Sequence, residues 1–263
     1  MATAVTEKVQ LLGKGLYKDI PDEITLRTIP TASELDYVGG DDFDKVMLEK
    51  ILPAAIVEDI NFNELLEVDY QWICRCLRIL NYGPYHTTNR ILCSDCGEMS
   101  FGEYQVNLKT IECVPFPNGF KNTFTLHRDE FINFEGEVTF KLPTIKEMLS
   151  AYNDKTFQDS EGKMNRSLAR LCYMITSIGD RADMIPLEIK AKILNEFSSA
   201  DYIILKDTVA ELSDYGLRAG GSCQCPNCGS MNGTYIALVD DRFFRPTVGN
   251  LRKWRDDTSP RKT

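Results

Sequence analysis

Four cysteines in two short motifs are the residues of this chain best suited to chemistry. Cys93-Ser-Asp-Cys96-Gly and Cys225-Pro-Asn-Cys228-Gly each place two thiols one tight turn apart. The glycine after the second cysteine suits a sharp turn in which a Cβ atom would be in the way. Two such motifs, here called knuckles, supply four sulfur ligands, the closed tetrahedral set that structural zinc prefers. The sequence therefore predicts a structural zinc ion bound by Cys93, Cys96, Cys225 and Cys228.

Two other interpretations of the knuckles stay open. They could be unrelated pairs of reduced thiols in turns, or redox dithiols. The redox interpretation is disfavoured because such motifs usually lie where a strand meets a helix, whereas strand-like sequence follows both knuckles.

Cys223 adds a further thiol two residues before Cys225, which leaves open which of the two binds metal. Cys74 and Cys76 point to different faces of a predicted helix and are interpreted as core thiols.

Motifs of the common enzyme classes are absent. The sequence has no His-Glu-x-x-His, no Gly-x-Ser-x-Gly, no Walker loop and no dinucleotide fingerprint. Its two histidines, His86 and His127, have no nucleophile in the same stretch. A zinc ion held by four sulfurs also has no open position for water. We therefore predict a protein that is not an enzyme.

Composition and charge restrict the class of protein further. The chain has 263 residues, is 43% hydrophobic and carries a net charge of −9. Residues 1–100 hold 17 acidic and 9 basic side chains, so most of the excess lies there. Such a surface repels phosphate backbones, and nucleic acid is not an expected partner. The basic stretch Leu251–Arg255, with Arg261 and Lys262, is interpreted as a solvated tail.

Location is predicted from what the sequence lacks. No secretory signal and no apolar run of roughly 20 residues is visible, so we expect synthesis in a reducing cytoplasm and no membrane span. The cysteine count of nine is odd, which also argues against a disulfide framework.

Periodicity and capping signals predict the elements that position the knuckles. A strand is expected over 24–29, a helix from the capping box Thr31–Glu34, and another helix after the acidic cluster at 41–44. A largely buried helix should start at Asp69 as N-cap, with Arg75 and Arg78 pairing with nearby acids. Further strands are expected over 104–108, 131–140 (turn at Glu135-Gly136) and 234–239. Further helices are expected from the capping box Thr144–Glu147 and over about 164–178, 186–198 and 200–215.

Together these elements predict an α+β fold that is mostly helical, with a split zinc-ribbon-like β element and a helical insertion between its two knuckles. Closing a loop of about 130 residues costs only a few kcal/mol more than closing a short one, because the cost grows with the logarithm of length. Zinc binding supplies on the order of 10 kcal/mol. The expected regions are 1–90, acidic with helices; 91–142, first knuckle and antiparallel strands; 143–219, helical bundle insertion; 220–250, second knuckle and strand; and 251–263, charged tail.

Several features follow one another in a characteristic order. They are a loop with Gly15 and Tyr17, the strand Ile24–Arg27, the helix start Pro30–Glu34, the lead-in Leu65–Asp69, the stretch Arg78–Tyr85, and then the first Cys-x-x-Cys. This order resembles the baseplate hub proteins of T-even-type contractile-tailed bacteriophages, including the related hub-assembly proteins. Two departures are Cys223, an extra thiol at the second knuckle, and the loop near Leu12, which lacks the Pro-Ser of many such proteins.

The resemblance implies a structural component or assembly factor of a phage tail baseplate hub, without enzymatic activity. Its location would be the virion, in the tail baseplate, or the host cytoplasm during assembly. Its partners would be other baseplate or tail proteins and copies of itself. The alternative function is a zinc-ribbon nucleic-acid-binding protein or transcription adaptor, a role that zinc ribbons often take but that the acidic charge disfavours.

Overall fold

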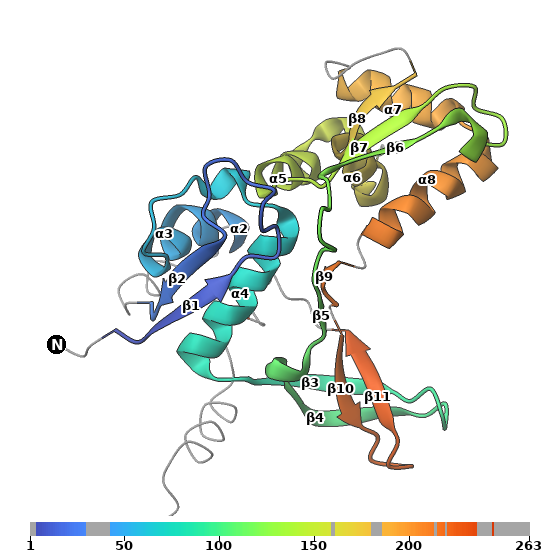
Figure 1. Ribbon diagram of the computed structural model, residues 1–263. Helices are drawn as coiled ribbons and strands as arrows, with labels where there is room; N and C mark the ends of the chain where they lie inside the picture. Colours follow the sequence, from blue (N-terminus) through green and yellow to red (C-terminus); the bar gives the residue numbers. More distant parts are fainter. Residues whose placement is uncertain are drawn as a thin grey trace, which may run out of the picture.

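The computed structural model describes residues 4–29, 43–158, 161–179, 186–212, 215–218 and 220–235, together with Phe244. Figure 1 shows three groups of elements: a group around helix α4, a group of strands and helices from the middle of the sequence, and two β-hairpins. Helices from the N-terminal and middle groups lie side by side, and α4 (Glu67–Tyr82) leads directly into the first of the two hairpins (Figure 1). The helix predicted from Thr31 and the basic tail from Leu251 lie outside the described residues.

The N-terminal group packs a β-hairpin against short helices and α4. Strands β1 (Thr6–Gln10) and β2 (Glu23–Arg27) pair antiparallel, and β2 overlaps the strand predicted over 24–29 but begins one residue earlier. The helical segment consists of α2 (Phe43–Val46), the π-helical turn η2 (Met47–Ile51) and α3 (Leu52–Ala55), and the 3-10 turn η3 (Phe62–Glu64) follows. Their apolar side chains form one core with those of α4.

Helix α4 (Glu67–Tyr82) is the long buried helix that the sequence predicts, but it begins three residues earlier than expected. Leu66 is its N-cap, and Asp69 lies buried within its first turn, so the prediction of Asp69 as N-cap is wrong. The carboxylate of Asp69 instead accepts hydrogen bonds from the backbone amides of Leu12 (2.6 Å) and Gly13 (3.0 Å) and from the Tyr17 hydroxyl. This side chain therefore attaches the loop after β1 to α4.

The arginines of α4 contact carbonyl oxygens. Arg78 is fully buried and donates to the carbonyls of Gly83 (2.6 Å) and Tyr85 (2.7 Å), and burial lowers its pKa to about 10. Arg75 donates to the carbonyl of Leu108 at 3.1 Å. These bonds fix the path of the chain from α4 into the first hairpin, and the pairing of Arg75 and Arg78 with nearby acids stays a prediction.

The middle group combines a small sheet with helices. Strands β6 (Thr123–Leu126), β7 (Val138–Lys141) and β8 (Ile175–Ile178) form an antiparallel sheet in the order β6-β7-β8. Short 3-10 turns η5 (Arg128–Glu130) and η6 (Lys155–Phe157) connect some of the elements. The helices are α5 (Ile145–Asn153), α6 (Arg166–Met174), α7 (Leu187–Glu196) and α8 (Ser199–Leu212). The predicted capping box of Thr144 and Glu147 starts α5.

The prediction of a mostly helical chain with a helical insertion is wrong. Helix makes up 42% of the structure and strand 25%, in small antiparallel sheets. The helix expected over 164–178 ends at Met174, and Ile175–Ile178 form β8, because two isoleucines of this segment can be buried against β7 and its backbone completes the sheet. The strand pair expected over 131–140 is also misplaced: only β7 lies there, and its partners are β6 and β8.

The two hairpins complete the fold. The first consists of β3 (Tyr85–Leu92) and β4 (Met99–Asn107), followed by the turn η4 (Leu108–Thr110). The second consists of β10 (Gly220–Gln224) and β11 (Met231–Tyr235). Strands β5 (Cys113–Val114) and β9 (Gly216–Leu217) pair where the chain runs between hairpins and middle group (Figure 1).

Candidate metal centre

Each knuckle is the turn of one hairpin. In the first, the amide of Gly97 donates to the carbonyl of Cys93 and the amide of Cys93 to the carbonyl of Glu98, both at 3.0 Å. In the second, Gly229 donates to Cys225 at 2.9 Å and Cys225 to Ser230 at 2.8 Å. Both glycines have positive φ, +70° and +77°, as the predicted sharp turn requires. The two knuckles therefore share one backbone conformation.

The hairpins contact each other through equivalent residues. Ser100 and Asn232, each four residues after the second cysteine of its knuckle, are buried. The side-chain oxygen of Asn232 accepts from the amide of Ser94 at 2.9 Å, and the side-chain amide of Asn227 donates to the hydroxyl of Ser100 at 3.0 Å. Each knuckle is thus held by a residue of the opposite hairpin. This reciprocity is the pattern expected of an approximate two-fold axis between the hairpins.

This arrangement brings together the four cysteines named by the sequence. Their Sγ atoms all lie within 4.8 Å of one another. Cys93 and Cys228 are 3.5 Å apart, and Cys96 and Cys225 are 3.9 Å apart. A tetrahedral zinc site with Zn–S bonds of about 2.3 Å places its sulfurs about 3.8 Å apart. The spacing of this four-cysteine cluster therefore suits one metal ion at its centre.

Protonation in the cluster is uneven. A hydrogen bond from Ser230, whose hydroxyl lies 3.3 Å from the Cys93 sulfur, is the main cause that lowers the pKa of Cys93 to about 5. The amide of Glu98 lowers the pKa of Cys96, but the neighbouring thiols of Cys93, Cys228 and Cys225 raise it to about 12. Thiols this close cannot all ionise without a cation between them, and a metal ion binds as their protons leave.

Burial divides the cluster into two pairs. Cys93 and Cys225, the first cysteine of each knuckle, are 1% exposed, whereas Cys96 and Cys228 are exposed. Ser230 also lies 2.9 Å from the Cys228 sulfur, so its hydroxyl joins one buried and one exposed sulfur. Sequence reasoning missed Ser230 and Asn232. The signal that could have found them is their position just after the second knuckle, where each knuckle needs a polar partner for its turn.

The other cysteines lie outside the cluster. Cys223, the alternative to Cys225, is buried against Leu217 and Val106, and its thiol lies 3.9 Å from the carbonyl of Asn232. The geometry thus places Cys225 in the cluster. Cys74 and Cys76 are core thiols, as predicted, and burial raises the pKa of Cys74 out of the physiological range. Among the residues that the structure describes, no second group of three or more metal-ligating side chains occurs.

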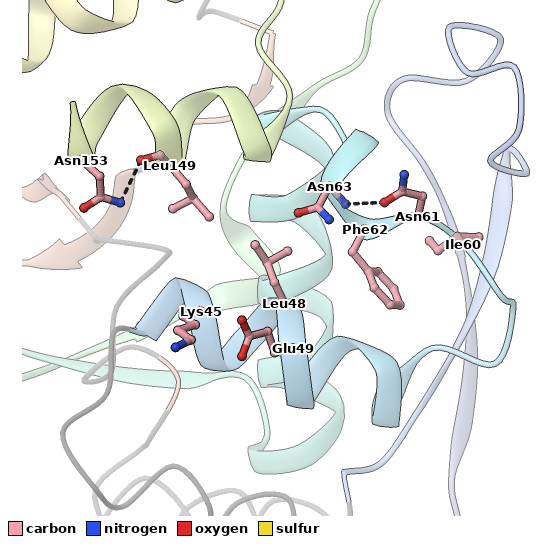
Figure 2. A pocket seen from close by; sticks show the side chains of 9 residues that line it. All are labelled: Lys45, Leu48, Glu49, Ile60, Asn61, Phe62, Asn63, Leu149 and Asn153. Carbon is pink, nitrogen blue, oxygen red and sulfur yellow. Dashed lines mark hydrogen bonds between the residues drawn. The ribbon is translucent and has the colours of Figure 1, made fainter.

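A surface pocket of about 450 Å³ lies between η2, η3 and α5 (Figure 2). Two of its asparagines hydrogen-bond to nearby backbone groups. Asn61 accepts from the amide of Asn63 at 3.2 Å, and Asn153 donates to the carbonyl of Leu149 at 2.9 Å. No nucleophile and base face each other among its lining residues, which are Lys45, Leu48, Glu49, Ile60, Asn61, Phe62, Asn63, Leu149 and Asn153.

Comparisons with protein-family models, curated proteins and solved structures found no match. Within the described part of the chain, no helix is both long enough and apolar enough to cross a membrane.

Proposed function

We propose that the four-cysteine cluster binds one structural zinc ion and that the chain is a structural component or assembly factor of a phage tail baseplate hub. The single observation that carries the zinc proposal is the closed set of four sulfurs. It is contributed by two hairpins whose knuckles are more than a hundred residues apart in sequence. Sulfur ligands and a tetrahedral spacing favour zinc over magnesium or calcium, which take oxygen ligands.

A structural role fits this cluster better than a catalytic one. Catalytic zinc sites keep one coordination position for water, usually with three protein ligands. Here four thiols are available, and the protein groups next to them are Ser230 and Asn232, which hydrogen-bond to sulfur or to the backbone. Such a zinc ion would connect the hairpin after α4 to the hairpin after α8, so that both helical groups keep fixed positions.

The baseplate assignment rests on the resemblance described above. It implies protein partners, with residence in the tail baseplate of the virion or in the host cytoplasm during assembly. The net charge of −9 supports protein contacts over binding to nucleic acid. Zinc at the four-cysteine cluster and membership of a baseplate are separate proposals, and each has its own test.

Crosslinking in infected cells tests the baseplate assignment. A tagged chain is expected to crosslink to tail or baseplate proteins, and the Cys96→Ser variant, with its hairpins released, is expected to do so less. The Cys74→Ala variant is the matched control because Cys74 lies in the core away from the cluster. A wild-type chain that contacts no tail protein would contradict the assignment. Salt-dependent binding of the purified chain to random DNA would favour the adaptor alternative instead.

A further inference from the structure

The outer face of the β3–β4 hairpin exposes three large apolar side chains next to the four-cysteine cluster. Leu92 is 63% exposed, Met99 49% and Phe101 75%. Leu92 pairs directly with Met99 across the hairpin, and Phe101 lies two residues beyond Met99, so all three lie on one face. Ser100 points to the opposite face, where Asn227 of the second hairpin contacts it. We call Leu92, Met99 and Phe101 the apolar face.

The second hairpin acts as an internal control for this face. Its positions equivalent to Leu92 and Phe101 are Gln224 and Gly233, yet it has the same knuckle hydrogen bonds and the same strand register. Large apolar side chains at these positions are therefore not needed to build a knuckle. A cluster of exposed apolar side chains without a structural purpose is typical of a binding site.

The end of the apolar face next to the knuckle is acidic. Asp95 and Glu98 are exposed in the first knuckle, directly between Leu92 and Met99 in sequence. Four thiolates with one Zn²⁺ add a formal charge of −2, a step that rests on the proposed zinc site. Neither 92–101 nor 224–232 contains a lysine or an arginine, and the nearest basic residue in register is Arg90, which pairs with Phe101 at the end of the face away from the knuckle. The end of the hairpin therefore combines apolar contact area with concentrated negative charge.

We propose that the apolar face is a docking site for a protein segment that carries apolar side chains flanked by lysine or arginine. The apolar contacts would supply affinity, and the charges would supply orientation and a faster association rate. Nucleic acid does not fit, because its phosphates would meet Asp95 and Glu98. A second copy of this chain fits poorly as well, since a symmetric contact through this face would bring two acidic knuckles together.

Two labelled peptides test the proposal on the full zinc-loaded chain by fluorescence anisotropy. One has leucine and phenylalanine interspersed with lysine, and the other has the same apolar residues with glutamate. The lysine peptide is expected to bind about tenfold more tightly, with an affinity that falls as salt is added. Phe101→Ser and Leu92→Gln, which copies Gln224, should each weaken its binding about tenfold. Glu98→Lys should weaken binding as well.

Met231→Ser is the matched control, because Met231 is the exposed counterpart of Met99 on the other hairpin and should leave binding unchanged. Equal binding of both peptides, or unaltered binding by Phe101→Ser and Glu98→Lys, would overturn the proposal. So would self-association of the wild-type chain that Phe101→Ser abolishes, since a second copy would then occupy the face. Zinc content is measured in every sample. A zinc-loaded chain that binds neither peptide contradicts only the docking site. A chain without zinc contradicts the proposed function.

Discussion

Asn232 accepts a hydrogen bond from the backbone amide of Ser94 at 2.9 Å, although the two residues are 138 positions apart in sequence. Asn232 is 3% exposed, and its side-chain amide also donates to the Ser230 carbonyl. The hairpins thus recognise each other through protein hydrogen bonds as well as through the cysteines. This bond also positions the first knuckle for its sulfurs to meet those of the second.

Asn232→Ala should therefore loosen the pairing of the hairpins. The Ser94 amide would lose its partner, and we expect a loss of about 1–3 kcal/mol in the free energy of unfolding, measured by denaturant titration of the zinc-loaded chain. Asn227→Ala is the matched control, because Asn227 is exposed and its side chain makes a single hydrogen bond across the hairpins; its loss should be smaller. Equal stability of the Asn232→Ala and wild-type chains would show that the bond contributes nothing.

Ser230→Ala should weaken metal binding without removing a ligand. The Ser230 hydroxyl lies within hydrogen-bonding distance of the Cys93 and Cys228 sulfurs and would stabilise their thiolates. Loss of such a supporting group typically reduces metal affinity by about 10–100-fold, and competition with a chromophoric chelator measures that change. Ser222→Ala, on the exposed side of the same hairpin, should bind zinc as the wild type does. A wild-type affinity for Ser230→Ala would exclude this supporting role.

Asp69→Ala should destabilise the N-terminal group strongly. Its carboxylate is the acceptor for two backbone amides, at Leu12 and Gly13, and for the Tyr17 hydroxyl. Removing it leaves buried donors without partners, for an expected loss of about 2–4 kcal/mol in the free energy of unfolding. Asp19→Ala, an exposed acid near the same loop, should change stability by less than about 0.5 kcal/mol. Similar losses for both variants would contradict the assigned role.

Glu67→Gln should change the pH dependence of stability. Burial raises the pKa of Glu67 above its ordinary value of 4.5, although the ion pair with Arg170, at 3.1 Å, lowers it. The folded state therefore binds this proton more tightly than the unfolded state does. The stabilisation from protonated Glu67 is complete below pH 4.5 and is lost as pH rises through the raised pKa.

Wild type should consequently lose stability relative to Glu67→Gln over that rise in pH, as measured by denaturant unfolding at several pH values. Glu188→Gln, at an exposed position of α7, is the control and should follow the wild-type curve. A constant difference between the Glu67→Gln and wild-type curves would mean that Glu67 keeps an ordinary pKa in the folded chain.

The cluster and several element starts could be predicted from local sequence. Two Cys-x-x-Cys-Gly motifs specify their own turns, and the pairing of Thr144 with Glu147 specifies the start of α5. Such signals depend on residues a few positions apart, so they can be recognised without knowledge of the tertiary structure. The core position of Cys74 followed in the same way from the apolar periodicity of α4.

The errors came from contacts between distant segments. Asp69 has the residue type of an N-cap, but its acceptors are used by Leu12 and Gly13, more than fifty residues away. Ile175–Ile178 continue the periodicity of α6, yet they pair with β7 and become β8. The contacts of Ser230 and Asn232 with the first knuckle likewise exist only after the hairpins meet. A local pattern can mark such a residue as a candidate, but it does not encode which distant segment that residue contacts.

Metal content of the purified chain is the sharpest test of zinc binding at the four-cysteine cluster. Elemental mass spectrometry of wild type, purified without added metal, should find one zinc ion per chain. Cys96→Ser and Cys228→Ser should lose it and unfold at a much lower temperature, since zinc binding contributes on the order of 10 kcal/mol. Cys223→Ser and Cys74→Ala should keep it. A wild-type chain without zinc would contradict zinc binding by this protein. Unchanged zinc content in both Cys96→Ser and Cys228→Ser would contradict binding at the four-cysteine cluster.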